Sequence, residues 1–228
     1  DTFGCSAVLA RKLLTSDKPA ICISQEIHAT GFFGKRPLLG IRKTLVRWLY
    51  PQAEMVFSVS NAVTEDLVQN YQIPKRKIKL LRNWVSMKTQ KVSRSKKTID
   101  IIYIGRFTPE KNLPLLLEAF ARLRSSHPNA TLSLVGYGEE EHNLRKNIEK
   151  LRLSSNVSFP GFTYDTEDFF SRSRVFVMTS HNEGIPLAML EAMAMGVPVV
   201  SGEFPGISEV IQHDKTGFIA DSAASLSQ

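Results

Sequence analysis

With 228 residues, 43% of them hydrophobic and 22% charged, the chain has the composition of a globular protein, which excludes disordered and fibrous classes. No apolar run approaches the length of a membrane-spanning helix. The net charge of +7 is unevenly spread, because residues 1–98 carry a balance of +12 and residues 99–228 a balance of −5. This asymmetry predicts two lobes in different surroundings.

The first 84 residues predict short strands alternating with helices, which is the pattern of a parallel sheet. Ser60 precedes one of these helices and is of a type preferred at the N-cap. Residues 85–97 are polar and basic without periodicity, so they predict a linker after a first domain at residues 1–84. The predicted strands are 20–24, 55–59 and 77–81, and the predicted helices lie near 6–14, 38–49 and 62–70.

The segment from Lys35 to Tyr50 combines basic and apolar residues on one predicted helix. Such a helix can seat a protein on an anionic lipid surface. The alternative is an ordinary amphipathic helix that covers a sheet. Nucleic acid is not an expected partner, because no recognisable nucleic-acid-binding module accompanies the positive charge.

Residues 98–228 predict a second, larger domain of the α/β class. Helical segments separate its predicted strands, and six strands joined by helical crossovers form a doubly wound parallel sheet. The first domain then resembles the latter half of a similar sheet. The strands of the second domain are predicted at 100–105, 131–135, 156–159, 174–178, 197–201 and 217–220.

Two cations follow the strand at 100–105. Gly105 ends this strand, and Arg106 and Lys111 lie in the loop before the next helix. Ligands of open parallel sheets bind beyond the carboxyl ends of strands. Arginine binds phosphate with a planar fork and lysine with a point charge, so the loop predicts a phosphate site. Two solvated loop cations are the alternative.

Two glutamates eight residues apart, Glu183 and Glu191, flank a predicted helix start at Pro186. Glu183 is expected in the loop before this helix and Glu191 inside it. The helix is apolar apart from Glu191, which predicts that it is buried on all sides. The helix N-terminus attracts phosphate, so the arrangement suits a ligand with a polyol at each end and phosphates between, such as a nucleotide sugar. A capping acid and one satisfied core glutamate are the alternative.

Two further motifs are interpreted as structural. The run Gly136-Tyr137-Gly138 is followed by three acids that would repel pyrophosphate, so it predicts a turn and a helix start rather than a dinucleotide site. The acids Asp165, Glu167 and Asp168 have no histidine nearby, so they predict a solvated helix start rather than a metal site.

Several short segments, taken together in their order along the chain, resemble the retaining family 4 glycosyltransferases. These are GT-B-fold enzymes of glycosyl transferases group 1. The resemblance covers roughly residues 20–221, and no single segment carries it alone. The matching segments are Ser58–Ser60, Lys77–Asn83, Gly105-Arg106, Glu110–Asn112, Val135–Gly138, Val157–Gly161, Glu183–Pro186, Glu191–Met193, Gly196–Val200, Gly206–Ile211 and Thr216–Ile219.

The resemblance implies two Rossmann-like domains and transfer of a hexosyl unit from a nucleoside-diphosphate sugar to a hydroxyl acceptor. The acceptor would be a glycan, a lipid-linked sugar or a polysaccharide, and the anomeric configuration would be retained without a metal or other cofactor. Carried over position by position, the implied catalytic residues are Glu183, Arg106 and Lys111. Glu26 and His28 follow a predicted strand end and are competing candidates for the acceptor side, with an ordinary loop histidine as the alternative for His28. The implied donor-binding residues are Gly105, Arg106, Lys111, Phe162, Gly184, Ile185, Pro186, Leu187 and Glu191.

The resemblance also implies a cytoplasmic enzyme, peripheral on the membrane and engaged in polysaccharide or lipid-linked glycan assembly. The family normally has further strands before the position of Asp1 and further helices after the position of Gln228. We therefore expect a chain truncated at both ends and nearly inactive as a transferase. A non-catalytic nucleotide-sugar-binding fragment and another GT-B enzyme, such as a nucleotide-sugar epimerase or a phosphorylase, stay open as alternatives.

Overall fold

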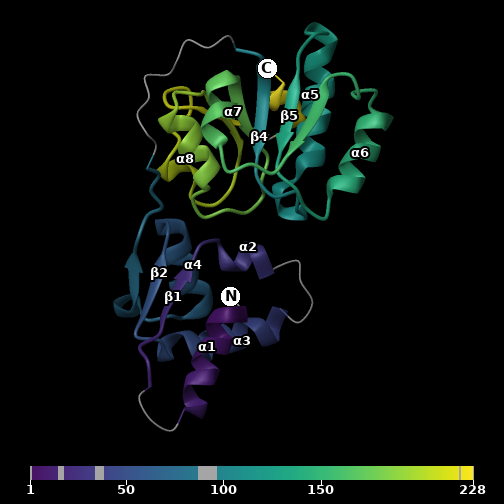
Figure 1. Cartoon of the computed structure of the whole chain (residues 1–228). Coiled ribbons are helices and arrows are strands. Elements are labelled where there is room, and N and C mark those ends of the chain that lie inside the picture. Colours follow the sequence, from purple (N-terminus) through teal and green to yellow (C-terminus); the bar gives the residue numbers. More distant parts are fainter. Residues whose placement is uncertain (1, 15–17, 34–38, 87–96, 221, 228) are drawn as a thin grey trace. The chain divides into compact units, whose positions relative to one another are not determined.

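The structure is a computed structural model that describes residues 2–14, 18–33, 39–86, 97–220 and 222–227 (Figure 1). Of the predicted linker, residues 87–96 lie outside the described residues, as does the start of the predicted basic helix at residues 34–38. The chain divides into two compact units. Unit 1 comprises Asp1–Asn83, Asn182–Ile185 and Pro205–Glu209, and unit 2 comprises Trp84–His181, Pro186–Phe204 and Val210–Gln228.

Unit 1 is built on a three-stranded parallel sheet in the order β1-β2-β3. Its strands and longer helices confirm the predicted alternation, while the five-residue helix α2 was not predicted because so short a segment shows no period. Its core gathers apolar side chains such as Leu49, Val56 and Leu67. The elements are α1 (Thr2–Leu13), β1 (Cys22–Gln25), α2 (Ala29–Phe33), α3 (Leu39–Leu49), β2 (Met55–Ser58), α4 (Asn61–Tyr71) and β3 (Ile78–Leu80), with short 3-10 turns at Tyr50–Gln52 and Lys75–Lys77.

Two side chains accept hydrogen bonds from the first backbone N–H groups of α4. Ser60 is the N-cap, and its hydroxyl accepts a hydrogen bond from the N–H of Val63 at 3.2 Å, as predicted. The Glu209 carboxylate accepts from the N–H groups of Asn61 and Ala62, each at 3.0 Å. A carboxylate at this position also complements the helix dipole, so α4 begins with its backbone donors already occupied.

Unit 2 contains a six-stranded parallel sheet in the order β6-β5-β4-β7-β8-β9, which confirms the doubly wound sheet. The chain builds outward from β4 in one direction and from β7 in the other, so the topological switch point lies between these two strands. The strands are β4 (Ile99–Ile104), β5 (Leu132–Val135), β6 (Val157–Gly161), β7 (Ser173–Met178), β8 (Val199–Gly202) and β9 (Phe218–Ala220).

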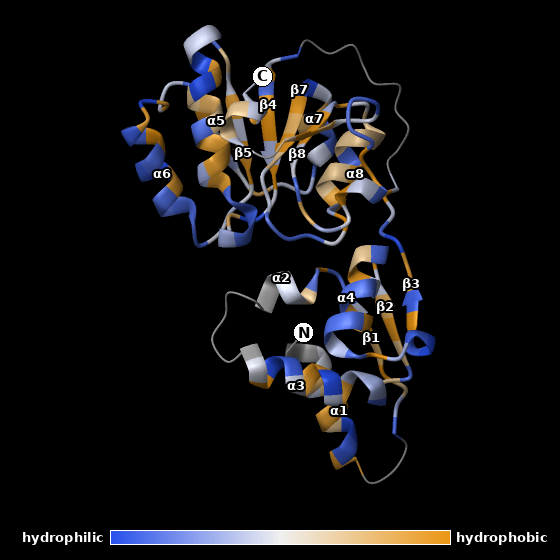
Figure 2. Ribbon diagram, turned by 180° about the vertical axis from the view of Figure 1, so that it is seen from behind, coloured by the Kyte–Doolittle hydropathy of each residue, from blue (hydrophilic) through white to orange (hydrophobic). Residues whose placement is uncertain are grey.

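Helices cover both faces of this sheet. Right-handed crossovers place α5 and α6 on one face and α7 and α8 on the other, and α5 also contacts α9. In Figure 2 the strands of this sheet are mostly orange and α6 is mostly blue, as expected for a buried sheet beneath an exposed helix. The helices are α5 (Leu113–Ser126), α6 (Glu141–Lys150), α7 (Thr166–Arg172), α8 (Leu187–Ala194) and α9 (Ala223–Leu226), with 3-10 turns at Pro109–Lys111 (η3) and Ile207–Glu209 (η4).

Burial along the strands agrees with a sheet that is covered on both sides. All four residues of β5 are buried, which is typical of a central parallel strand. Phe170 of α7 and Phe176 of β7 are buried against each other, with ring centroids 5.8 Å apart. The sheet is therefore a rigid base for the loops that leave its strand ends.

Both motifs interpreted as structural have the predicted form. Asp165 is the N-cap of α7 and accepts from the N–H of Asp168 at 3.1 Å. The segment after Gly136 turns into α6, which begins at Glu141. Among the described residues, no three His, Cys, Asp or Glu side chains gather as a metal site. No helix within the same residues is long and apolar enough to cross a bilayer.

Candidate functional site

The loops after β4 and β7 are joined at the switch point of unit 2. The hydroxyl of Thr179, directly after β7, lies 3.0 Å from the carbonyl oxygens of both Lys111 and Asn112. The N–H of His181 donates to the carbonyl oxygen of Glu110 at 3.0 Å. These contacts hold the loop with Arg106 and Lys111, here called the cationic loop, at the carboxyl ends of the central strands. Ligands of this architecture bind there.

The segment after β5 holds the start of the same loop from the other side. The N–H of Phe107 donates to the carbonyl oxygen of Tyr137 at 2.9 Å, and the N–H of Glu140 donates to the carbonyl oxygen of Phe107 at 3.0 Å. A Cβ atom on Gly138 would collide with the Phe107 backbone, so only glycine permits this approach. The glycines of this run therefore serve the packing of the cationic loop.

The two predicted cations differ in exposure. The Arg106 side chain is 71% exposed, and its Nη2 atom lies 3.9 Å from Glu110 Oε1. An exposed ion pair at that distance contributes little, so the guanidinium keeps donors for a ligand. Its backbone is fixed, because the buried Tyr103 hydroxyl donates to the Arg106 carbonyl oxygen at 2.9 Å. Lys111 is half-buried at the end of η3.

Two hydroxyls in these loops are buried without a hydrogen-bond partner among the described residues. They are Thr108 Oγ1, in the loop after β4, and Ser180 Oγ, in the loop after β7. Most buried polar atoms in proteins have a partner, so a pair of unsatisfied hydroxyls at neighbouring strand ends suits a polar ligand or water. Sequence reasoning missed both, although a hydroxyl residue just beyond a strand end was a visible signal.

The N-terminus of α8 is open. Pro186 is its N-cap, one residue earlier than the predicted place in the first turn, and makes no side-chain capping bond. Within the described residues no side chain accepts from the N–H groups of the first turn, so these groups can bind an anion. The prediction that α8 is buried on all sides is wrong, because Leu187 is 50% exposed. The helix covers one face of the sheet, so only inward residues such as Met189 and Ala192 are buried.

The two glutamates have the predicted places in the chain but not the expected burial. Glu191 is the fifth residue of α8 and is half-buried, whereas Glu183 is only 6% exposed. Glu191 was expected to be buried with its helix, which the structure does not show, and the burial of Glu183 was not predicted. Glu191 lies on a helix with one open side, while the loop that carries Glu183 packs within unit 1.

Contacts within unit 1 fix the loop around Glu183. Gly184 forms an antiparallel bridge with Ile27, and a Cβ atom on Gly184 would collide with the Glu26 carbonyl oxygen. The Asn83 amide donates to the Ile185 carbonyl oxygen at 2.6 Å. The close approach of two backbones explains the glycine at this position.

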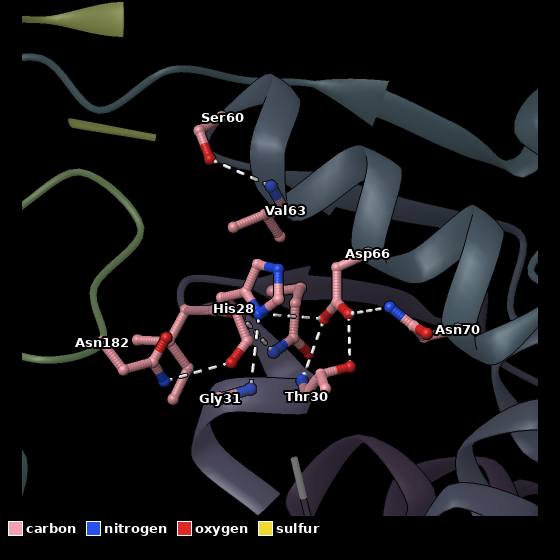
Figure 3. A network of polar contacts seen from close by, with 10 residues as sticks. His28, Thr30, Gly31, Ser60, Val63, Asp66, Asn70 and Asn182 are labelled. Carbon is pink, nitrogen blue, oxygen red and sulfur yellow. Dashed lines mark hydrogen bonds and ion pairs between the residues drawn. The ribbon is translucent and has the colours of Figure 1, made fainter. Parts of the chain in front are cut away.

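The predicted acceptor-side residues also lie in unit 1, directly after β1. Glu26 is exposed, and the His28 side chain is 19% exposed. The His28 carbonyl oxygen accepts from Asn182 Nδ2 at 3.1 Å, and its Nδ1 atom accepts from the Gly31 N–H at 3.3 Å (Figure 3). Unit 1 therefore brings His28 to the loop that carries Glu183.

An exposed row of aromatic rings lies beyond β5 and β6 in unit 2. Phe162 makes edge-to-face contacts with Tyr137 and Tyr164, at centroid distances of 5.7 and 4.7 Å. Exposed rings of this kind can stack on a planar base. Phe162 was a predicted site residue, whereas Tyr137 and Tyr164 were not, because their proximity depends on two separate strand ends.

The structure thus distributes the predicted residues over both units. Unit 2 holds seven of the predicted site residues, including both cations, and unit 1 holds the acceptor-side residues and the remaining donor-binding ones. Those in unit 2 are Gly105, Arg106, Lys111, Phe162, Pro186, Leu187 and Glu191, and those in unit 1 are Glu26, His28, Glu183, Gly184 and Ile185.

Family profiles match nearly the whole chain. The profile described as "Glycosyl transferases group 1" matches residues 86–227, and the profile described as "Glycosyltransferase Family 4" matches residues 2–88. A putative colanic acid biosynthesis glycosyltransferase, WcaL of Escherichia coli K12, is 30% identical over 193 residues, which are 79% of this chain and 47% of WcaL. The chain spans about half the length of the curated relatives it matches.

Solved structures share the fold. A mutant of S. aureus TarM, solved with fondaparinux, alpha-GlcNAc-glycerol and UDP, matches with a TM-score of 0.81 and 20% identity, over 98% of this chain and 49% of that one. Anabaena Alr3699/HepE, solved with UDP and glucose, matches with a TM-score of 0.76 and 21% identity, over 91% of this chain and 60% of that one. At these identities the likeness establishes a GT-B-type α/β fold.

Proposed function

Because the chain belongs to the glycosyl transferases group 1 family, we propose that it binds a nucleoside-diphosphate sugar and transfers the hexosyl unit to a hydroxyl acceptor with retention of configuration. The main support is the pair of joined loops at the switch point between β4 and β7, which carries Arg106, Lys111 and two unsatisfied hydroxyls. The UDP bound in TarM and HepE makes UDP-sugars the first donors to test.

In the proposed reaction, negative charge develops on the departing nucleoside diphosphate. Arg106, Lys111 and the open N-terminus of α8 stabilise that charge, which is the usual role of fixed donors and cations in such a step. Glu191 binds the ribose hydroxyls, and Glu183 binds the hydroxyls of the transferred sugar. No residue needs to act as a covalent nucleophile, and no metal ion or cofactor is required.

The test is to measure binding and turnover separately with the full chain. Calorimetry against UDP-, GDP- and ADP-sugars identifies the donor, and product analysis in the presence of EDTA and a hydroxyl acceptor identifies the reaction and the anomer. We expect one class of donor to bind, and transfer of its sugar to be slow and independent of metal. An altered free nucleotide sugar would instead indicate an epimerase, and binding without turnover would favour a non-catalytic binding fragment.

We further propose that the outer face of α1 and α3 contacts anionic lipid, as the basic segment predicts. The inner side of α3 packs in the core of unit 1 through Val46 and Leu49, in agreement with an amphipathic helix on a sheet. Its outer side leaves Trp48 59% exposed, with the Lys12 ammonium 4.4 Å from the ring centroid. Basic residues beside exposed apolar ones suit the surface of a membrane. The exposed apolar residues are Leu9, Leu13, Leu14, Ile41, Leu45 and Trp48.

Trp48 offers a direct test of lipid contact, because the only other tryptophan is Trp84, in unit 2. In a Trp84→Phe background, vesicles containing phosphatidylglycerol should shift Trp48 fluorescence to the blue, and rising salt should weaken the effect. Phosphatidylcholine vesicles serve as the control. A shift that ignores lipid charge and salt would contradict this surface as a site for anionic lipid.

A further inference from the structure

Asp66 of α4 is a buried carboxylate whose hydrogen bonds join two helices of unit 1. It accepts from the backbone N–H of Thr30 at 3.0 Å, from the Thr30 hydroxyl, and from Asn70 Nδ2 at 2.9 Å (Figure 3). A buried charge is costly unless donors surround it, and here three donors do so. Thr30 is the second residue of α2, so Asp66 anchors the first turn of that helix.

The anchored turn immediately follows His28, whose ring faces the same carboxylate. His28 Nδ1 lies 3.6 Å from Asp66 Oδ2 and accepts the N–H of Gly31 at 3.3 Å. The neutral ring therefore carries its proton on Nε2. A flipped ring would place carbon against the Gly31 amide and lose this bond. The Gly31 bond thus selects one ring orientation and, against the attraction of the nearby carboxylate for a proton on Nδ1, one tautomer.

We propose that Asp66 is a positioning residue that holds the His28 imidazole with its Nε2–H available to a sugar oxygen. Asp66 fixes the Thr30 turn, the turn fixes the Gly31 amide, and that amide fixes the ring. The His28 carbonyl oxygen is held separately by Asn182, so both ends of the residue are restrained. The inference rests on the proposed function, because His28 matters only if a sugar or acceptor hydroxyl binds beside it.

Asp66→Asn is the principal test, since it keeps the shape but replaces one carboxylate oxygen with a donor that opposes the Thr30 N–H. Long-range 1H–15N spectra of the full chain with labelled histidine report the tautomer of each of the five rings. His28→Gln assigns the His28 signal. We expect a pure Nε2–H tautomer in the wild type, and a mixture for His28 alone in Asp66→Asn.

Two further variants keep the test decisive. Asn70→Ala is the matched control, because it removes a hydrogen bond from the same carboxylate on the side away from His28, and the His28 signal should not change. Thr30→Val removes the hydroxyl, with its bonds to Asp66 and Tyr71, but keeps the backbone N–H bond to Asp66. It should shift the His28 tautomer in the same direction. It carries the test if Asp66→Asn fails to fold.

Turnover with a nucleotide-sugar donor separates positioning from mere stability. We expect Asp66→Asn to lower kcat by about 2- to 150-fold, the range of coupled neighbouring residues, with unchanged affinity for the nucleoside diphosphate. In a His28→Ala background, Asp66→Asn should lower kcat no further.

An unchanged His28 tautomer in both Asp66→Asn and Thr30→Val would overturn the inference. Full activity in a variant whose His28 is no longer purely in the Nε2–H form would also overturn it. A chain that transfers no sugar at all would refute the proposed function, while the spectra would still decide whether Asp66 orients His28.

Discussion

The two units hold their candidate site residues in different ways. In unit 2 the cationic loop follows a strand end directly and is held by the ends of the neighbouring strands β5 and β7. In unit 1 the residues around His28 and Glu183 are held by partners far away in the sequence, such as Asn182 with His28, which are 154 positions apart. Topology therefore determines one half of the candidate site, and long-range side-chain packing determines the other.

The largest expected effects concern the separate cores. Phe176→Ala should lower the stability of unit 2 by roughly 3–5 kcal/mol, and Leu67→Ala should lower that of unit 1 by roughly 2–5 kcal/mol, because both side chains are fully buried. Amide hydrogen exchange under mild denaturant reports each unit separately. If either substitution reduced protection equally in both sheets, the units would not be separately stable.

The next effect should be confined to unit 2. Arg106→Ala and Lys111→Ala should each weaken UDP binding by roughly 1–3 kcal/mol, because each removes charge-assisted hydrogen bonds to phosphate. Calorimetry measures this directly. The matched controls Arg122→Ala and Lys146→Ala remove the same charges from exposed positions on α5 and α6 and should leave affinity unchanged. Equal affinity in all four variants would remove the phosphate role from the loop after β4.

Glu183 belongs to unit 1 and Glu191 to unit 2, so substitutions of this pair test the two units separately. Glu191→Gln should weaken binding of UDP itself by about 1 kcal/mol, since it alters a ribose contact. Glu183→Gln should leave UDP affinity unchanged but impair binding or turnover of the nucleotide sugar. Titrations with UDP and with its sugar conjugate separate these effects. If Glu183→Gln weakened both ligands and Glu191→Gln neither, the assignment of the two carboxylates would be reversed.

The smallest expected effect is the loss of stability of unit 1 at acidic pH. The Ile21 backbone N–H, at 2.7 Å, and the Arg11 guanidinium, at 2.7 Å, hold the pKa of Glu54 below its usual value of 4.5. A lowered folded-state pKa contributes stability above pH 4.5 that is lost as the pH falls through the folded value. The melting temperature should therefore fall less between pH 6 and pH 3 in Glu54→Gln than in the wild type. Added salt should reduce this difference between the two proteins.

Sequence patterns predicted the strands and the parallel sheets of both halves of the fold, because these depend on local periodicity. They also predicted the position of the loop with Arg106 and Lys111, because ligands bind beyond strand ends. They did not predict the Asp66–Thr30 contact, whose partners are 36 positions apart, or the helix α2 that it anchors. They also did not predict the burial of Glu183, and they wrongly predicted that the helix with Glu191 is buried on all sides. Composition around a helix does not reveal which side of it the sheet covers.

Gly184 and Glu209 have a consequence for recombination between related genes. Segments 182–185 and 205–209 are encoded within the second half of the chain, yet they pack with residues before position 84. A chimera joined at 83/84 would therefore place a foreign loop against the backbone at Glu26 and a foreign acid at the start of α4. Such a chimera should fold stably only when segments 182–185 and 205–209 come from the same parent as residues 1–83.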